Sequence, residues 1–84
     1  MKNPEISQDK KYPRFFVIFD EDKLKKYPIW DKISCVRVEG PEVKYKFIYK
    51  NGDIKIGGGD VTSCDKTVSK GIWREIPIEE VALL

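Results

Sequence analysis

The sequence contains no histidine and only two cysteines among its 84 residues. Because these two residue types supply most ligands of structural zinc ions, the sequence lacks the side chains for such a site. A nucleophile such as Ser63 or Cys64 also has no histidine to act as its base. We therefore expect a protein that is not an enzyme, holds no metal and needs no cofactor.

Long apolar runs are also missing. The first ten residues hold no apolar stretch like that of a signal peptide, and no segment approaches the ~18 apolar residues that span a bilayer. We therefore expect a cytoplasmic protein with no membrane partner. In that reducing compartment Cys35 and Cys64 are expected to stay unpaired, as small and partly buried thiols.

A strong excess of one charge is absent as well. Sixteen Lys and Arg residues face fourteen Asp and Glu residues, which leaves a net charge of +2. Dedicated DNA-binding domains carry a larger basic excess, so nucleic acid is not the expected partner. Any site for an anion must come from a local arrangement of cations.

What the chain does contain is enough apolar material for one small folded domain, with 40% hydrophobic residues. Residues 1–11 are polar and predict a loose arm, and residues 12–84 predict a single β-rich domain. The segment RFFVIF, residues 14–19, predicts a central strand that is covered on both faces or lies at an oligomer interface. Short helices are expected over residues 20–28 and after Pro77, whereas residues 60–71 are expected to form a polar loop with a short strand around residues 61–64. The fold class is then α+β or mainly β, a small antiparallel sheet of four or five strands with one or two short helices.

The clearest local signal is VKYKFIYKNGDIKI, residues 43–56, in which two alternating runs are joined by Asn51 and Gly52. This pair predicts a β-hairpin with a two-residue type I′ turn. Its register places Tyr49 opposite Ile54 and the following glycines opposite lysines 44 and 46 and Tyr45. One face of the hairpin would then carry the aromatic residues and isoleucines, and the other would carry the lysines.

Three consecutive glycines follow the hairpin, and they match neither the dinucleotide-binding motif nor the P-loop. Their expected role is a strand end or a bulge, with Tyr45 lying over Gly58. The alternative is a cradle in which bare backbone approaches a phosphate while nearby cations neutralise it. An arginine would be the natural bidentate clamp, and a tryptophan could stack on a base. The candidate ligand-binding residues are Lys44, Tyr45, Lys46, Lys55, Gly57, Gly58, Gly59, Arg14, Arg37 and Trp73.

Both ends of the domain carry a familiar pattern, YPRFF at residues 12–16 and WREIPIEE at residues 73–80. They resemble the ends of small uncharacterised accessory proteins encoded by bacteriophages. That resemblance implies a small antiparallel sheet with short helices, and a counter-defence or host-takeover role in the cytoplasm of the host cell. By analogy with small phage proteins that act as sponges, it also implies sequestration of a nucleotide-type immune signal without cleavage.

Three functions therefore compete. The first is sequestration of a small phosphorylated ligand of the nucleotide type. The second is inhibition of a host or defence enzyme by protein binding, through an exposed sheet edge or the terminal VALL of residues 81–84. The third is weak binding of nucleic acid by a basic hairpin face. Residues 14–19 and 81–84 hold more apolar surface than one small domain readily covers, which predicts a homo-oligomer.

Overall fold

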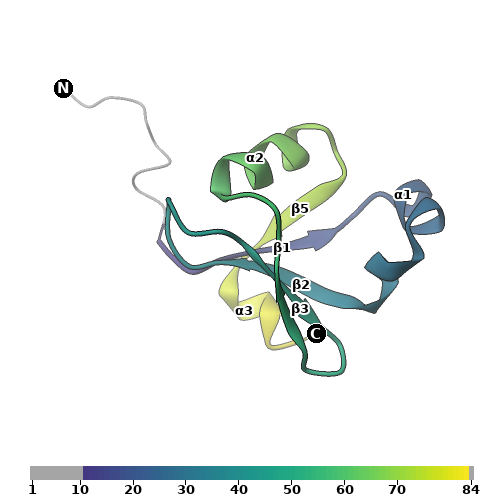
Figure 1. The fold of residues 1–84 in the computed structure, drawn as a ribbon, viewed down its shortest axis with the longest axis horizontal. Helices are drawn as coiled ribbons and strands as arrows, with labels where there is room; N and C mark the ends of the chain where they lie inside the picture. Colours follow the sequence, from purple (N-terminus) through teal and green to yellow (C-terminus); the bar gives the residue numbers. More distant parts are fainter. Residues whose placement is uncertain (1–10, 84) are drawn as a thin grey trace.

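The computed structural model describes residues 11–83, which form one five-stranded antiparallel sheet with helices packed on both faces (Figure 1). The strands lie in the order β4-β3-β2-β1-β5. They are β1 (Arg14–Ile18), β2 (Ile33–Val38), β3 (Lys46–Tyr49), β4 (Ile54–Ile56) and β5 (Trp73–Ile76). The helices are α1 (Glu21–Lys26), α2 (Val61–Ser69), α3 (Ile78–Val81) and the 3-10 helix η2 (Pro28–Lys32). This confirms the predicted class.

The predicted loose arm falls outside the described residues, apart from Lys11. Within residues 11–83, no helix has both the length and the apolar character that a membrane crossing requires. The predicted short helix after Asp20 is present as α1, whose N-terminus is capped by the Asp20 carboxylate.

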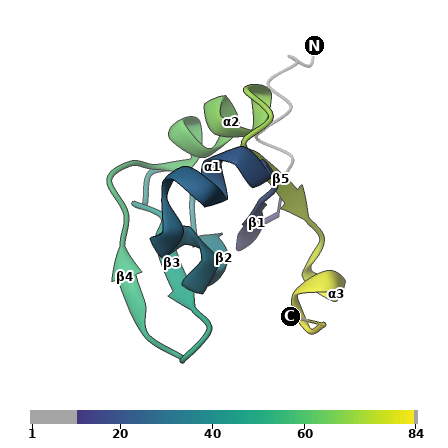
Figure 2. The ribbon, with the colours of Figure 1, turned by 90° about the vertical axis from the view of Figure 1, so that its right-hand side faces the viewer.

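Alternation along the strands gives the sheet two different faces, which we name after the helices that cover them. On the α2 face, Phe16, Val36 and Trp73 pack against Val61 and Cys64 of helix α2. On the α3 face, a smaller cluster of Phe15, Cys35 and Ile76 packs against Val81 of helix α3. Helix α3 lies at the β5 end of the sheet, so the β4 end of this face is left uncovered (Figure 2).

The prediction for residues 14–19 is partly corrected. Phe15 and Phe16 are buried on opposite faces of β1, so cover on both faces is confirmed. The middle strand is β2, however, because β5 pairs with the outer side of β1. Burial on both faces requires a helix on each side of the strand, and it does not require the central position.

The expected polar loop over residues 60–71 is wrong, because this segment contains the nine-residue helix α2. Asp60 caps it, since the Asp60 side chain accepts a hydrogen bond from the Thr62 N–H at 2.9 Å. Val61, Cys64 and Val68 are spaced by three and four residues, so all three contact the sheet side of the helix. Gly71, with φ of +79°, ends the helix in the left-handed conformation.

The hairpin is present, but its register differs by one residue from the prediction. The Tyr49 N–H donates to the Asp53 carbonyl at 2.8 Å, so the loop contains three residues, 50–52. Only Gly52 has a positive φ, +97°, as in a type I turn followed by a bulge. Phe47 therefore pairs with Lys55, and Ile48 pairs with Ile54. A slip of one residue moves each side chain of β4 to the opposite face of the sheet. Lys55 is therefore on the α2 face, and Ile54 and Ile56 are on the α3 face.

The two cysteines are unpaired and buried, as the sequence predicts. They lie on opposite sides of the sheet, Cys35 in β2 and Cys64 in α2. Burial raises the pKa of Cys35, and burial with the neighbouring Asp65 charge raises the pKa of Cys64 to about 12. Both side chains are therefore neutral, unreactive packing groups near pH 7.

Candidate functional site

The three glycines follow the end of strand β4, and an aromatic ring covers the first of them, which matches the strand-end role. The Tyr45 carbonyl accepts from the Gly57 N–H at 2.7 Å, and the Tyr45 N–H donates to the Gly59 carbonyl at 2.8 Å. Gly58 is thereby left outside the pairing. A Cβ atom added to Gly57 would collide with the Tyr45 ring, whereas one added to Gly58 would meet nothing. The ring thus covers Gly57, and not Gly58 as predicted, because of the one-residue slip.

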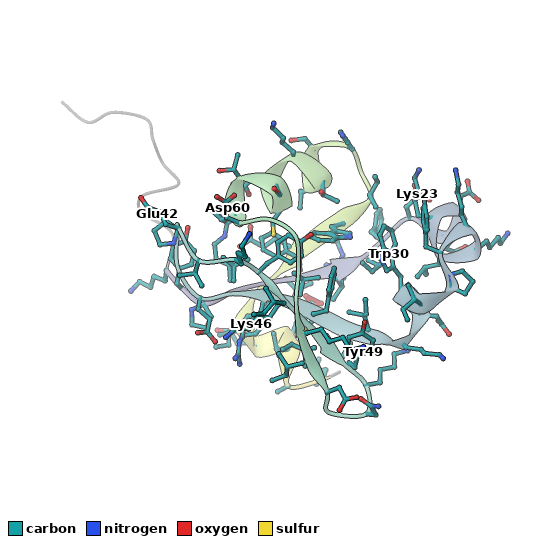
Figure 3. All side chains as sticks on the ribbon, in the orientation of Figure 1. Lys23, Trp30, Glu42, Lys46, Tyr49 and Asp60 are labelled. Atoms are coloured by element: carbon teal, nitrogen blue, oxygen red, sulfur yellow. The ribbon has the colours of Figure 1, made fainter. Side chains whose placement is uncertain are left out.

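A pocket of about 350 Å³ lies beside these glycines, but its charge does not suit a phosphate. Among the described residues of its lining, Lys44 is the one cation, and Glu42 and Asp60 supply two carboxylates. Both carboxylates lie at one end of the molecule (Figure 3). The Asp60 side chain already bonds the Thr62 N–H at the start of α2, where an anion would otherwise be held. Ser63, Gly58 and Gly59 complete the lining.

The other predicted cations of the hairpin do not converge on this pocket. Lys46 and Arg37 lie side by side on the α3 face, where the Glu39 carboxylate is 3.8 Å from Lys46 Nζ and 2.6 Å from Arg37 Nη2. Lys55 is on the opposite face, with its Nζ 5.4 Å from the centre of the Tyr49 ring. The sheet itself separates these charges, so they form no common basic face.

Arg14 is an anion clamp, but its anions are side chains of the same chain. It is 4% exposed. Its Nε and Nη2 donate to the two Glu75 oxygens at 2.9 and 2.7 Å, and Nη2 also reaches Asp65 at 3.0 Å. Hydrogen bonding to Glu75 raises the pKa of Arg14 against the opposing effect of burial, and Asp65 adds to the rise. This cluster joins β1, β5 and α2.

Trp73 is a core residue and not an exposed stacking surface. It is 5% exposed. Tyr45 and Phe47 meet it edge to face, with ring centres 5.6 and 6.4 Å away. The Phe16 ring centre lies 6.3 Å from that of Trp73. These rings fill the space between α2 and the sheet, so Trp73 fixes the position of Tyr45 over the glycines.

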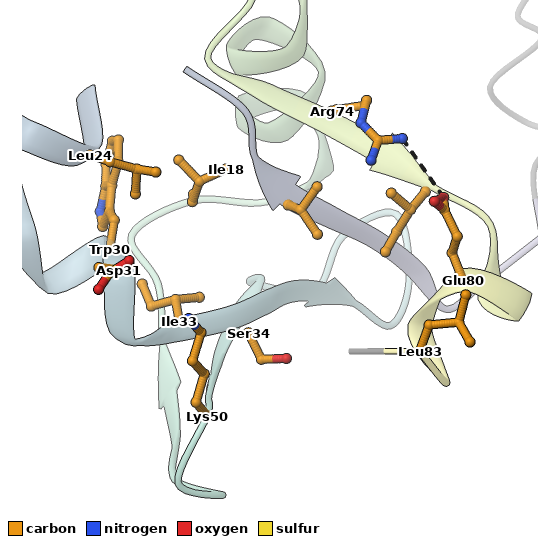
Figure 4. Close-up of a pocket in the computed structure, with 12 residues that line it drawn as sticks. Ile18, Leu24, Trp30, Asp31, Ile33, Ser34, Lys50, Arg74, Glu80 and Leu83 are labelled. Atoms are coloured by element: carbon orange, nitrogen blue, oxygen red, sulfur yellow. Dashed lines mark ion pairs between the residues drawn. The ribbon is translucent and has the colours of Figure 1, made fainter. Parts of the chain in front are cut away.

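A groove on the α3 face was not predicted from the sequence. It lies between α1 and η2 on one side and α3 on the other, above strands β1 and β5, and has a volume of about 350 Å³ (Figure 4). Its apolar lining consists of Val17, Ile18, Leu24, Trp30, Ile33, Ile76 and Leu83. Its polar lining consists of Asp31, Ser34, Lys50, Arg74 and Glu80.

The charged side chains among the described residues that line the groove are two cations and two carboxylates. Lys50 and Arg74 are cations, and Asp31 and Glu80 are carboxylates. Arg74 Nη1 and the Glu80 oxygen are 3.7 Å apart, and both side chains are about half exposed (Figure 4). Such an exposed pair holds its geometry weakly and can exchange partners. An apolar floor with a balanced polar rim suits an amphipathic ligand better than a free anion, and the volume is within the usual range of about 300–1,000 Å³ for ligand sites.

No local motif could have revealed this groove. Its lining comes from segments throughout the domain, from Val17 in β1 to Leu83 beyond α3. The chain matches no protein-family model, no curated protein and no solved structure. The proposals below therefore depend on the geometry and chemistry of the chain itself.

Proposed function

We propose that this chain is a non-enzymatic protein-binding module, and that its groove on the α3 face accepts an apolar segment of a partner protein. The observation that carries the proposal is the apolar floor around Val17 and Ile76, open to the outside between two helical walls. Ile76 itself is only 4% exposed, so the floor is rigid core and is ready to receive a side chain without rearrangement.

The rim defines the chemistry of the partner. One or two large apolar side chains would occupy the floor, and charged groups beside them would pair with Arg74 and Glu80 in place of their mutual contact. Leu83 stands 82% exposed at the edge of the groove, where a partner would cover it. With the resemblance of the chain ends to phage accessory proteins, we propose a host or defence enzyme as the partner and the host cytoplasm as the place of action.

A randomised peptide display library provides the test. Selection on the wild-type protein should yield peptides rich in large apolar residues. Leu83→Asp and Arg74→Glu, both at exposed positions, should each weaken the selected peptides about tenfold or more, because they put charge on an apolar wall or reverse the rim. Ile78→Asp and Lys25→Glu are the matched controls, since both residues are exposed but do not line the groove. Peptides that bind all four variants equally would place the binding surface elsewhere.

Sequestration of a small phosphorylated ligand is the second proposal. Its support is the pocket in which Lys44, the Ser63 hydroxyl and the bare backbone of Gly58 and Gly59 meet. The two carboxylates in that lining would repel a phosphate, so we propose protein binding at the groove ahead of ligand sequestration.

Weak binding of nucleic acid requires a basic face on the hairpin. The hairpin has no such face, because Lys55 and Lys46 lie on opposite faces of the sheet. The homo-oligomer also remains a proposal, and edge strand β4 is its candidate contact.

A further inference from the structure

Strand β4 presents a free edge. The Asp53 carbonyl accepts from the Tyr49 N–H of β3, and the Gly57 N–H donates to the Tyr45 carbonyl, so by alternation the backbone of residues 53, 55 and 57 points at β3. The N–H and C=O groups of Ile54 and Ile56 therefore point outward. Within residues 11–83 no strand pairs with this side of β4. An unpaired edge of this kind is a template for another strand.

The side chains along this edge are apolar on one face and charged on the other. Ile54 and Ile56 are 52% and 68% exposed on the α3 face. Ile54 continues a row formed by Ile48 and Cys35 in the neighbouring strands. On the α2 face stand Asp53 and Lys55, of opposite sign and two residues apart. The Asp53 carboxylate is held near the turn by Asn51, whose side-chain nitrogen donates to it at 3.3 Å.

We propose that the outer edge of β4 pairs antiparallel with β4 of a second copy of this chain, with the two-fold axis at Ile54. This inference rests on the proposed homo-oligomer and adds its contact and register. Ile54 then meets Ile54 of the partner subunit, and Lys55 meets Asp53 of the partner subunit. By symmetry Asp53 meets Lys55 of the partner subunit, so two opposite-charge pairs form on one face.

The neighbouring registers lack this complementarity. A two-fold axis at Lys55 would oppose two lysines directly, which is unfavourable. An axis at Ile56 would place Lys55 opposite Gly57 of the partner subunit, so no charge pair forms. In the proposed register the row of Ile48 and Ile54 continues into the second copy. The floor of the groove lies above β1 and β5, at the other end of the strand order from β4, so the contact leaves this floor open in both copies, and a multivalent partner would gain avidity. One rim residue, Lys50, comes from the loop beside β4.

Charge reversal tests the register through the two single variants. Asp53→Lys and Lys55→Asp should each weaken self-association about tenfold or more in sedimentation equilibrium, because like charges then face each other. An equimolar mixture of the two variants should recover association as a heterodimer, detected by native mass spectrometry, since lysines then face aspartates. Thermal melting of each variant verifies that the monomer is folded.

Ile54→Asn tests the two-fold contact, and Ile78→Asn is its control, because Ile78 is similarly exposed at 58% but lies on α3. Ile54→Asn should weaken self-association, and Ile78→Asn should leave it unchanged. A wild-type protein that stays monomeric at all concentrations overturns both the homo-oligomer and this contact. A wild-type dimer that is unaffected by either charge reversal overturns the contact alone and leaves the homo-oligomer in place.

Discussion

Replacing Glu75 with glutamine is expected to destabilise the fold by about 3 kcal/mol, the lower end of the range for breaking a buried ion pair, because Arg14 is buried whereas Glu75 is 30% exposed. Arg14 stays buried and charged in this variant, and among residues 11–83 it keeps Asp65 as its one charged partner. The glutamine amide would also turn one donor toward the donors of the guanidinium. Urea denaturation, followed by tryptophan fluorescence or circular dichroism, measures the change in the free energy of unfolding.

Two variants show whether burial is the cause. Glu39→Gln removes a carboxylate that also contacts an arginine, Arg37, but both side chains of this pair are about a third or more exposed. It should therefore change the free energy of unfolding by less than about 1 kcal/mol. Arg14→Met removes the buried charge itself and should be milder than Glu75→Gln, because Glu75 and Asp65 can still reach water. Equal effects of Glu75→Gln and Glu39→Gln would show that the Arg14 cluster does not anchor β1, β5 and α2.

Gly57→Ala is expected to destabilise the fold by about 2 kcal/mol through overpacking. The added Cβ would collide with the Tyr45 ring. The ring has little freedom to move, because it packs edge to face on Phe47 and Trp73 with centres 5.3 and 5.6 Å away. The effect is steric and not conformational, since Gly57 does not have a positive φ.

Gly58→Ala is the matched control, because a Cβ at Gly58 meets nothing within 4 Å and its φ is not positive either. It should change stability by no more than about 0.5 kcal/mol. Thermal melting of the two variants in parallel provides the comparison. If both variants melt alike, the Tyr45 ring swings aside freely, and the glycine at position 57 is not required by packing.

Element types were largely predictable from the sequence, whereas the hairpin register was not. Asn51 and Gly52 correctly mark the turn, but the same pair fits a two-residue type I′ loop and a three-residue loop in which Gly52 alone has a positive φ. The difference is one residue, and it exchanges every side chain of β4 between faces. Helix α2 was missed for another reason: only Val61, Cys64 and Val68 carry its apolar pattern, in an otherwise polar segment.

The candidate site shows the same limit at the level of tertiary contacts. Arg14 was expected to bind an anionic ligand, whereas in the fold it binds the carboxylate of Glu75, 61 residues away, bidentately. Local spacing cannot show that such a distant acid pairs with the arginine within the fold. The groove is assembled from six helices and strands, so its existence depends on how α1 and α3 are placed at the edges of the α3 face.

A nuclear magnetic resonance titration of the ¹⁵N-labelled protein, with a display-selected peptide and separately with mono-, di- and cyclic nucleotides, distinguishes the two binding surfaces. The groove proposal predicts that the peptide shifts the backbone amide signals of Ser34, Arg74, Ile76 and Leu83 saturably, while nucleotides leave Lys44, Gly58 and Gly59 unmoved. Saturable nucleotide-induced shifts at Lys44, Gly58 and Gly59, with the groove signals unchanged by any selected peptide, would contradict it and establish the glycine segment as the binding site.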